Sequence, residues 1–105
     1  MKKKIKLRAF VGDDGITTVK AILFHPMETG MRKDRKTGKT IPAHHITEAV
    51  VEHNGKPVLT CLWGTGVSKN PFLSFDLKNT QVGDRLRISW VDNKGASDAI
   101  EARLS

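Results

Sequence analysis

Residues 46–63 read Ile-Thr-Glu-Ala-Val-Val-Glu-His-Asn-Gly-Lys-Pro-Val-Leu-Thr-Cys-Leu-Trp. Apolar and β-branched side chains flank a central Asn54-Gly55 pair. Asn-Gly between two such runs is the strongest short signal of a β-hairpin, because a type I′ turn needs positive φ at both central positions. The stretch therefore predicts two antiparallel strands, 46–53 and 56–63, and a fold built from hairpins.

A turn of only two residues also predicts how the two strands pair. It places Val50 opposite Leu59, Val51 opposite Val58 and Glu48 opposite Cys61. Side chains alternate between the two faces of a strand, so each face receives its own set. One face is expected to carry Val50, Leu59, Cys61 and Trp63, and the other Ala49, Val51, Val58 and Leu62.

The same period of two continues on both sides of this hairpin. It predicts further strands at about 4–10, 16–25 and 72–78, and around 86–90 and 100–104. Turn-forming residues separate them, such as Asp92-Asn93-Lys94-Gly95 before the last strand. The segment 16–25 is apolar on both faces, which favours a central place in a sheet.

These seven short segments, with no helical stripe, predict an all-β fold in a single domain over residues 1–105. The spacing favours a seven-stranded antiparallel immunoglobulin-like sandwich, and a closed barrel is the alternative. With a lone cysteine there is no internal disulfide, so packing alone must hold the core. The residues expected in that core are Leu23, Phe24, Phe75, Ile88 and Trp90.

The segment 26–45 interrupts the alternation and predicts a long surface loop. Prolines and glycines break any ladder there, and the cations could not be buried; these residues are Pro26, Gly30, Gly38, Pro42, Arg32, Lys33, Arg35, Lys36 and Lys39. A connection of about twenty residues exceeds the usual range, and such loops are functional or disordered. Met27, Met31 and Ile41 supply apolar anchors, which favours an ordered, functional loop over a floppy excursion.

The net charge of +7 and the pI near 9.9 indicate a negatively charged partner: nucleic acid, anionic lipid or an acidic protein surface. A surface that binds nucleic acid needs aromatic side chains among its cations. All aromatic residues fall on or beside the expected strands, and none lies in 26–45. Met27 and Met31 beside Arg32 are more typical of a protein contact. A basic β-domain that binds nucleic acid or another polyanion remains the alternative.

Neither metal binding nor catalysis has a recognisable motif. The histidines are His25, His44, His45 and His53, and no acidic residue stands at a familiar ligand spacing from them. His44 and His45 are adjacent, so they should point to opposite sides of an extended chain. Cys61 falls within an expected strand, where a thiol usually acts as a small buried hydrophobe. No metal site, cofactor or catalytic residue is therefore expected.

The loop and the residues on either side of it resemble a known protein family. Residues 25–34, His-Pro-Met-Glu-Thr-Gly-Met-Arg-Lys-Asp, followed by Gly-Lys-Thr-Ile-Pro at 38–42 and His45-Ile46, resemble the signature stretch of the SoxZ family. The resemblance continues through Asn54-Gly55-Lys56 and Asn70-Pro71-Phe72. The family belongs to the sulfur-carrier complex of bacterial thiosulfate oxidation and is described as an immunoglobulin-like sandwich.

The resemblance implies a subunit that performs no catalysis, holds no cofactor and pairs with SoxY as a heterodimer. SoxY bears the sulfur intermediate on a cysteine in its mobile C-terminal tail. The end of this chain, 101–105, does not match that tail, so Cys61 is not expected to be the carrier cysteine. Binding of nucleic acid or of a membrane is not implied.

The resemblance also implies a location. The pair works in the periplasm, and members without a signal peptide are thought to be exported with their signal-bearing partner. In this chain Lys6 and Arg8 precede any apolar run, so neither a signal peptide nor a transmembrane segment is expected.

The loop is where partner contacts are expected. The proposed partner-binding residues are Met27, Met31, Arg32, Lys33, Lys39 and Ile41. The methionines are expected at the seam with SoxY, since flexible thioethers pack well at interfaces. Arg32 and Lys33 are expected to dock other Sox enzymes.

Overall fold

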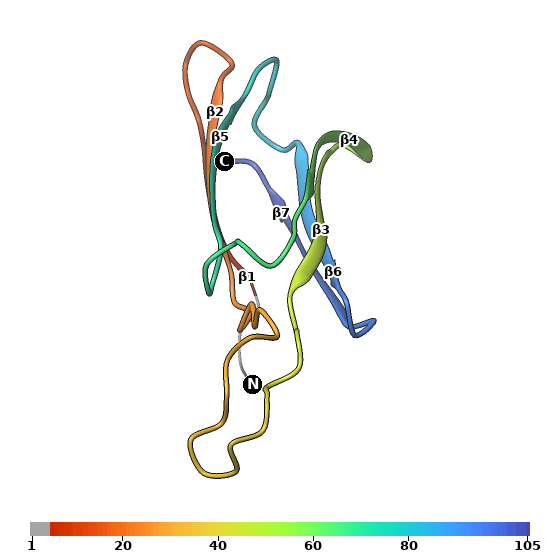
Figure 1. Ribbon diagram of the computed structural model, residues 1–105. Helices are drawn as coiled ribbons and strands as arrows, with labels where there is room; N and C mark the ends of the chain where they lie inside the picture. The colour runs from red at the N-terminus through yellow and green to blue at the C-terminus, as the bar shows by residue number, and fades with distance from the viewer. Residues whose placement is uncertain (1–4) are drawn as a thin grey trace.

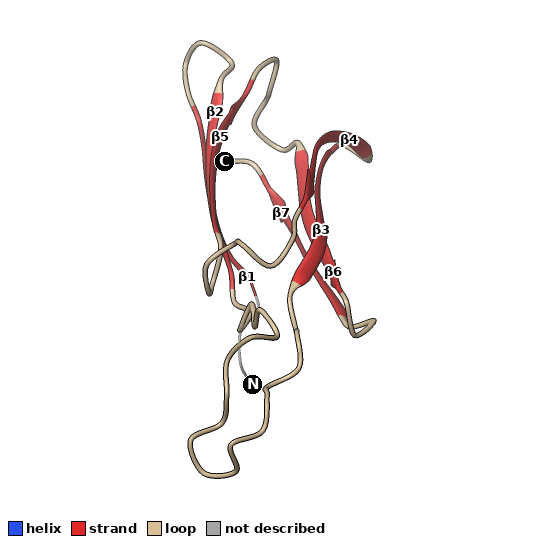
Figure 2. Cartoon of the chain, viewed as in Figure 1, coloured by secondary structure: helices blue, strands red, loops and turns tan. Residues whose placement is uncertain are grey.

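The computed structural model describes residues 5–105 and shows seven strands in two antiparallel sheets (Figures 1 and 2). One sheet has the order β1-β2-β5, with β1 at Ile5–Val11, β2 at Thr17–Leu23 and β5 at Phe72–Leu77. The other has the order β4-β3-β6-β7, with β3 at Ile46–His53, β4 at Lys56–Leu62, β6 at Arg85–Asp92 and β7 at Ser97–Arg103. The predicted immunoglobulin-like sandwich is confirmed.

The described part of the chain forms two separate sheets, so the closed barrel is wrong. β1 and β7 approach each other at one end, where the Val11 N–H donates a hydrogen bond to the Ser105 carbonyl. The predicted central position of the second strand is confirmed, since β2 pairs with both β1 and β5. Lys4, the expected start of the first strand, lies outside the described residues. Within 5–105 no helix is long and apolar enough to cross a membrane.

The core lies between the two sheets. The fully buried large side chains include Leu23, Ile46, Leu86 and Ile88, with Trp90 close to fully buried. Leu23, Ile88 and Trp90 were predicted correctly, and Phe75 packs partly buried against this cluster.

The placement of Phe24 in the core is wrong, since 36% of this residue is exposed. Regular pairing of β2 ends at Leu23, whose N–H donates to the Pro71 carbonyl. Because side chains alternate along the chain, Phe24 falls on the same side as Ile22. That side is the outer face of the sheet, away from the buried Leu23.

The hairpin at Asn54-Gly55 is confirmed, and its two turn residues have φ of 52° and 84° as a type I′ turn requires. The predicted register is wrong beyond the first two pairs. Val51 pairs with Leu59 and Glu52 with Pro57, so Val58 is the extra residue of a β-bulge. Pro57 has no N–H to donate to a regular ladder, which gives a physical reason for the bulge at this place.

The bulge changes which side chains of this hairpin face the core. Ala49 and Val51 are buried, and Leu59, Cys61 and Trp63 pack against the same core. The grouping of Val50 with Leu59, and of Ala49 with Val58 and Leu62, was therefore wrong. Val58 and Leu62 are instead exposed on the outer face of β4.

Residues 26–45, which we call the arm, extend away from the sandwich as a narrow two-stranded excursion (Figure 1). Two isolated bridges, Glu28 with His44 and Lys33 with Thr40, hold its two sides together. At its tip the Asp34 N–H donates to the Lys39 carbonyl over 2.8 Å. These hydrogen bonds agree with the prediction that residues 26–45 form an ordered loop rather than a floppy excursion. The arm contributes to the elongated shape of the molecule, which is 55 Å long and little more than 20 Å wide.

Two features of the arm require a glycine at position 30: the backbone conformation there and the close approach of Ala43. Gly30 has φ of 88°, a conformation that other residues rarely adopt. A Cβ at this position would also stand 3.2 Å from the Cβ of Ala43 on the opposite side of the arm. The two sides of the arm can therefore pack closely here because residue 30 has no side chain.

Candidate functional site

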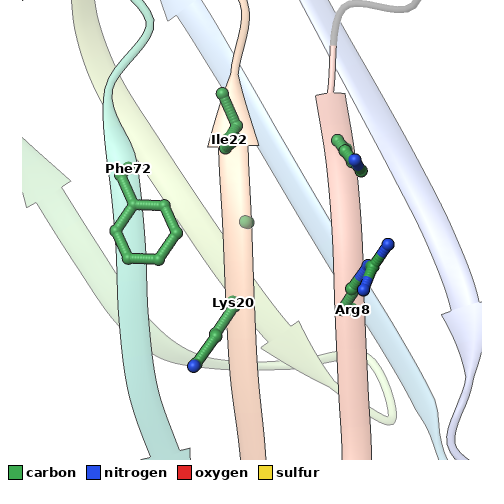
Figure 3. A pocket seen from close by; sticks show the side chains of 6 residues that line it. Arg8, Lys20, Ile22 and Phe72 are labelled. Atoms are coloured by element: carbon green, nitrogen blue, oxygen red, sulfur yellow. The ribbon is translucent and has the colours of Figure 1, made fainter.

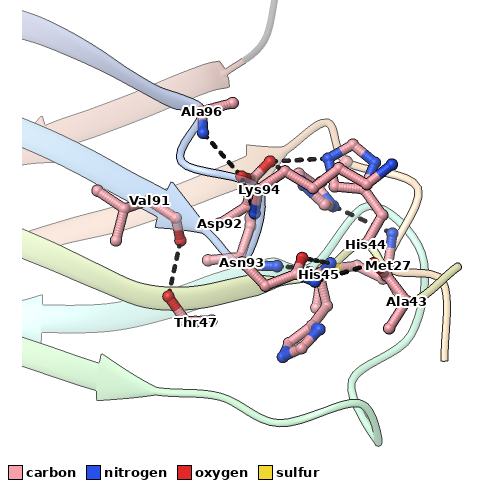
Figure 4. A network of polar contacts seen from close by, with 12 residues as sticks. Met27, Ala43, His44, His45, Thr47, Val91, Asp92, Asn93, Lys94 and Ala96 are labelled. Carbon is pink, nitrogen blue, oxygen red and sulfur yellow. Dashed lines mark hydrogen bonds and ion pairs between the residues drawn. The ribbon is translucent and has the colours of Figure 1, made fainter. Parts of the chain in front are cut away.

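A buried carboxylate, Asp92, joins the arm to the sandwich (Figure 4). Its Oδ2 atom lies 3.0 Å from the Nε2 atom of His25 and 2.8 Å from the Nε2 atom of His44. Its Oδ1 atom accepts hydrogen bonds from the backbone N–H groups of Lys94 and Ala96. One side chain thereby connects His44 at the end of the arm, and His25 directly before the arm, with the turn between β6 and β7.

The local sequence explains why Asp92 can bind the turn that follows it and the two histidine rings at the same time. It ends β6 and begins the turn Asp92-Asn93-Lys94-Gly95, and an aspartate at such a position binds backbone N–H groups a few residues further on. This local role uses Oδ1 alone. Oδ2 is left to accept hydrogen bonds from the arm, as a carboxylate oxygen has more than one acceptor position.

The hydrogen bonds also fix the protonation of His25. Its Nδ1 atom accepts a hydrogen bond from the backbone N–H of Met27 over 3.1 Å. The proton of the neutral ring must then sit on Nε2, which donates it to Asp92. His25 is also packed edge-on against Trp90, with the ring centroids 5.2 Å apart.

His25, His44 and Asp92 also form a set of three groups whose ligand atoms lie within 4.8 Å of one another. Two imidazoles and a carboxylate are donors that zinc accepts. An ion on Nε2 of His25 would move the ring proton to Nδ1, directly against the Met27 N–H. The geometry therefore favours a hydrogen-bond network over a metal site. The absence of a metal stays a prediction.

The other histidines lie elsewhere. His45 is not part of the Asp92 network: its backbone N–H donates to the Asn93 side chain over 2.8 Å, and the Nδ1 atom of its ring is buried without a hydrogen-bond partner. The ring of His53 bonds Asp84 over 2.7 Å next to the hairpin turn. The sequence argument failed in one respect, since it looked for carboxylates close in sequence. The fold brings Asp92 to His25 across 67 positions.

The environment shifts the pKa values of this network. Burial opposes ionisation of Asp92, but hydrogen bonds from His25, His44 and two backbone N–H groups outweigh it and lower the pKa to about 2. Burial is the main cause that lowers the pKa of His25 below its ordinary 6.5, and the hydrogen bond to Asp92 only partly opposes it. Asp92 is thus ionised and His25 neutral at pH 7.

These shifts predict that the free energy of unfolding falls with acid in two steps. The unfolded chain protonates His25 more readily than the folded chain does, so stability is lost as pH falls below 6.5. A second loss, on the order of 2 kcal/mol, follows between pH 3.8 and about 2 as Asp92 is protonated. Urea unfolding at a series of pH values measures both steps. Subtracting the profile of Asp92→Asn isolates the lower step, and an unchanged profile in that variant would contradict this assignment.

The two methionines of the arm, Met27 and Met31, differ in how far they are buried. Met27 has φ of 50°, which turns its side chain inward, and only 5% of the residue is exposed. Its Sδ atom accepts a hydrogen bond from the Ile46 N–H over 3.3 Å. The assignment of Met27 as a partner-binding residue is therefore corrected, since its side chain belongs to the core of this chain. Met31 is 86% exposed.

The charged residues of the arm differ in whether they form an ion pair within this chain. Arg32 forms a bidentate pair with Glu28, with Nη2 to Oε2 at 2.6 Å, so its guanidinium already has a carboxylate partner. This pair lowers the pKa of Glu28 and raises that of Arg32. Lys33 and Lys39 are exposed, and Ile41 is half-buried. The arm thus presents Met31 and free cations on a framework stiffened by its own ion pair.

The residues that the sequence argument missed are Asp92 and Glu28. Asp92 was recognised only as a turn former, and nothing near it in sequence marks its second role. Glu28 stands four positions before Arg32, a spacing at which opposite charges pair on a helix but which had no meaning in a predicted loop. The site as a whole has no activated nucleophile. What it can do is hold an arm in one orientation.

Comparison with protein families gives a match over nearly the whole chain. The family model described as SoxZ, sulphur oxidation protein SoxZ, matches residues 5–103. The matched range includes both sheets, the arm and Asp92. Comparison with individual curated proteins gave no match.

Proposed function

The chain belongs to the SoxZ family of sulphur oxidation proteins, and we propose that it is the non-catalytic subunit that pairs with SoxY. Membership of the family makes it a subunit of the Sox sulfur-oxidation complex. In the proposed division of labour SoxY carries the sulfur intermediate, and this chain supplies a rigid body and a docking arm. The observation that carries the proposal is the family match, which covers the arm and the network that orients it.

The chemistry of the only cysteine supports a non-catalytic role. Cys61 lies half-buried on the inner face of β4, packed against the core. Burial raises the pKa of its thiol, so the reactive thiolate is disfavoured. Along with the other side chains of the inner face, it contributes packing rather than reactivity.

We expect Cys61→Ser to leave sulfur loading of the reconstituted complex unchanged. Its cost is in stability, about 1 to 2 kcal/mol of unfolding free energy, because a hydroxyl replaces a thiol in an apolar environment. Mass spectrometry of SoxY after incubation with thiosulfate and the loading enzymes measures the first quantity, and urea unfolding the second. A variant that folds and pairs with SoxY yet no longer supports loading would show that Cys61 takes part in the chemistry.

The arm is the part proposed to meet SoxY. Met31 is exposed on a backbone that is already folded, so little conformational entropy is lost when it packs against a partner. Ile41 adds apolar surface close to the Arg32 backbone, to which its N–H is bonded. Lys33 and Lys39 can attract acidic surfaces of SoxY or of other Sox enzymes. The complex is proposed to act in the periplasm, which this chain would reach by export together with a signal-bearing SoxY.

Size-exclusion chromatography of the purified chain mixed with SoxY tests the proposal. We expect one heterodimer peak that persists when the salt concentration is raised, because packed apolar contacts are little affected by screening. Separate elution at both salt concentrations would contradict it.

A specific observation keeps the polyanion-binding alternative open for test. Phe10 and Phe72 lie on strands as predicted, yet they face outward and are 64% and 59% exposed. Aromatic side chains are thus available beside cations after all, as binding to single-stranded nucleic acid requires. Fluorescence anisotropy with a single-stranded oligonucleotide at low and high salt tests this alternative, since binding to nucleic acid weakens steeply as the salt concentration rises.

A further inference from the structure

The outer face of the β1-β2-β5 sheet is exposed in this chain and has an unusual composition. The register places Lys6, Ile22 and Phe72 side by side in one row across the three strands. Arg8, Lys20 and Ser74 form the next row, and Phe10, Thr18 and Asp76 the one after it. We call these nine positions the outer patch.

Two apolar side chains of the outer patch, Ile22 and Phe72, lie together in its first row. Phe72 is 59% exposed and Ile22 beside it is half-buried; Phe24, directly after β2 and outside the patch, falls on the same side as Ile22. A shallow hollow of about 160 Å³ opens here, with Ala21, Ile22 and Phe72 among the residues that line it (Figure 3). A cavity of about 150 Å³ is enough for a benzene-sized group, so the hollow has room for one apolar side chain.

Three cations line the β1 and β2 side of the hollow. Lys6, Arg8 and Lys20 complete its lining, and none of them forms an ion pair with any residue in the described range 5–105. The only carboxylate of the outer patch is Asp76, which lies two rows away from Phe72 along β5. On the opposite sheet, by contrast, the outward-facing Arg87 is paired with Glu52. Within the described residues no ion pair therefore neutralises the three cations beside the hollow.

We propose that the outer patch is a docking surface for an acidic protein segment that inserts one apolar side chain into the hollow. The apolar side chain would cover Ile22 and Phe72, and the flanking carboxylates would pair with Lys6, Arg8 and Lys20. Exposed apolar surface rimmed by charge is typical of a site of protein interaction. This inference does not depend on pairing through the arm, because no arm residue belongs to the patch.

The arrangement favours a protein segment over nucleic acid. Single-stranded nucleic acid binds along a track of cations with aromatic rings spaced for successive bases. Here the cations are grouped beside one hollow on β1 and β2, and Phe10 stands two rows away from Phe72, opposite Thr18. One anchoring side chain with carboxylates next to it fits this geometry better than a run of stacked bases.

Titration of the isotope-labelled chain by NMR tests the proposal. The probe is a short synthetic peptide of aspartate and glutamate with one central phenylalanine, and the reference peptide has serine in its place. We expect amide shifts concentrated on β1, β2 and β5, and about tenfold weaker binding of the serine peptide. Lys20→Glu should weaken binding of the phenylalanine peptide about tenfold or more, because it places a like charge next to the peptide.

Two matched variants control for general effects of charge and hydrophobicity. Lys56→Glu changes an exposed lysine of β4, and Leu62→Ser an exposed apolar side chain of the same strand. Both should bind the phenylalanine peptide like the unchanged chain, whereas Phe72→Ser should weaken it. Equal binding of the two peptides, equal effects of Lys20→Glu and Lys56→Glu, tighter binding of an oligonucleotide at the same face, or no binding would each overturn the proposal.

Discussion

Replacement of Asp92 by alanine is expected to lower the free energy of unfolding by about 3 kcal/mol. The variant loses four hydrogen bonds, two to histidine rings and two to backbone N–H groups. His25 remains buried with an N–H group that has no acceptor. A buried donor without a partner costs more than the hydrogen bond itself contributes.

Urea unfolding followed by tryptophan fluorescence measures the effect, since Trp90 packs against His25. Asp76→Ala is the matched control, because Asp76 is an exposed strand aspartate with no ion pair in the part of the chain that the structure describes. It should change the free energy of unfolding by less than about 0.5 kcal/mol. A similarly small loss for Asp92→Ala would show that the network does not hold the arm.

The second large effect is expected in pairing. Met31→Asp combined with Ile41→Asp should weaken the complex with SoxY about a hundredfold, because two charges would have to be desolvated at the interface without partners. Fluorescence titration against labelled SoxY measures the dissociation constant, and circular dichroism checks that the variant keeps its strands. Ile41 is half-buried, so Met31→Asp alone serves as a milder variant with about a tenfold effect.

Val82→Asp is the control for this experiment. Val82 is 73% exposed in the turn before β6 and is not part of the arm. A charge there should leave pairing unchanged. If Val82→Asp and the arm variant weaken pairing equally, the effect is one of solubility or charge rather than of the arm. Met27 is unsuitable for such a test, because a charge at this buried position would destabilise the chain itself.

Local signals explain what the sequence predicts well. The hairpin at Asn54-Gly55 is correct because the turn conformation depends on those two residues and their positive φ. The alternation that marks the strands is likewise a local pattern, and it led to the correct two-sheet architecture. The register failed because the bulge at Val58 depends on how the strand pairs after Pro57, which the period of two does not record.

The candidate site was less predictable because its contacts are long-range. Asp92 meets His44 across 48 positions, and only the fold makes them neighbours. Met27 was misplaced for a related reason. Its polar neighbours are typical of a surface loop, but a positive φ at this residue directs its side chain into the core. The exposure of residues such as Lys33 and Lys39 was easier to predict, since charged side chains in a loop remain exposed whatever the fold.

Hydrogen exchange of the arm, measured in the free chain and in the presence of SoxY, tests the central claim most directly. The claim is that a pre-folded arm, held by Asp92, is the surface that meets SoxY. In the free chain the amides of Glu28, Ile41 and His44 should already exchange slowly, because each donates to a backbone carbonyl across the arm. With SoxY present, exchange across residues 28–41 should slow further, while β7 stays unchanged. Fast exchange throughout the free arm, or protection by SoxY only outside it, would contradict the account.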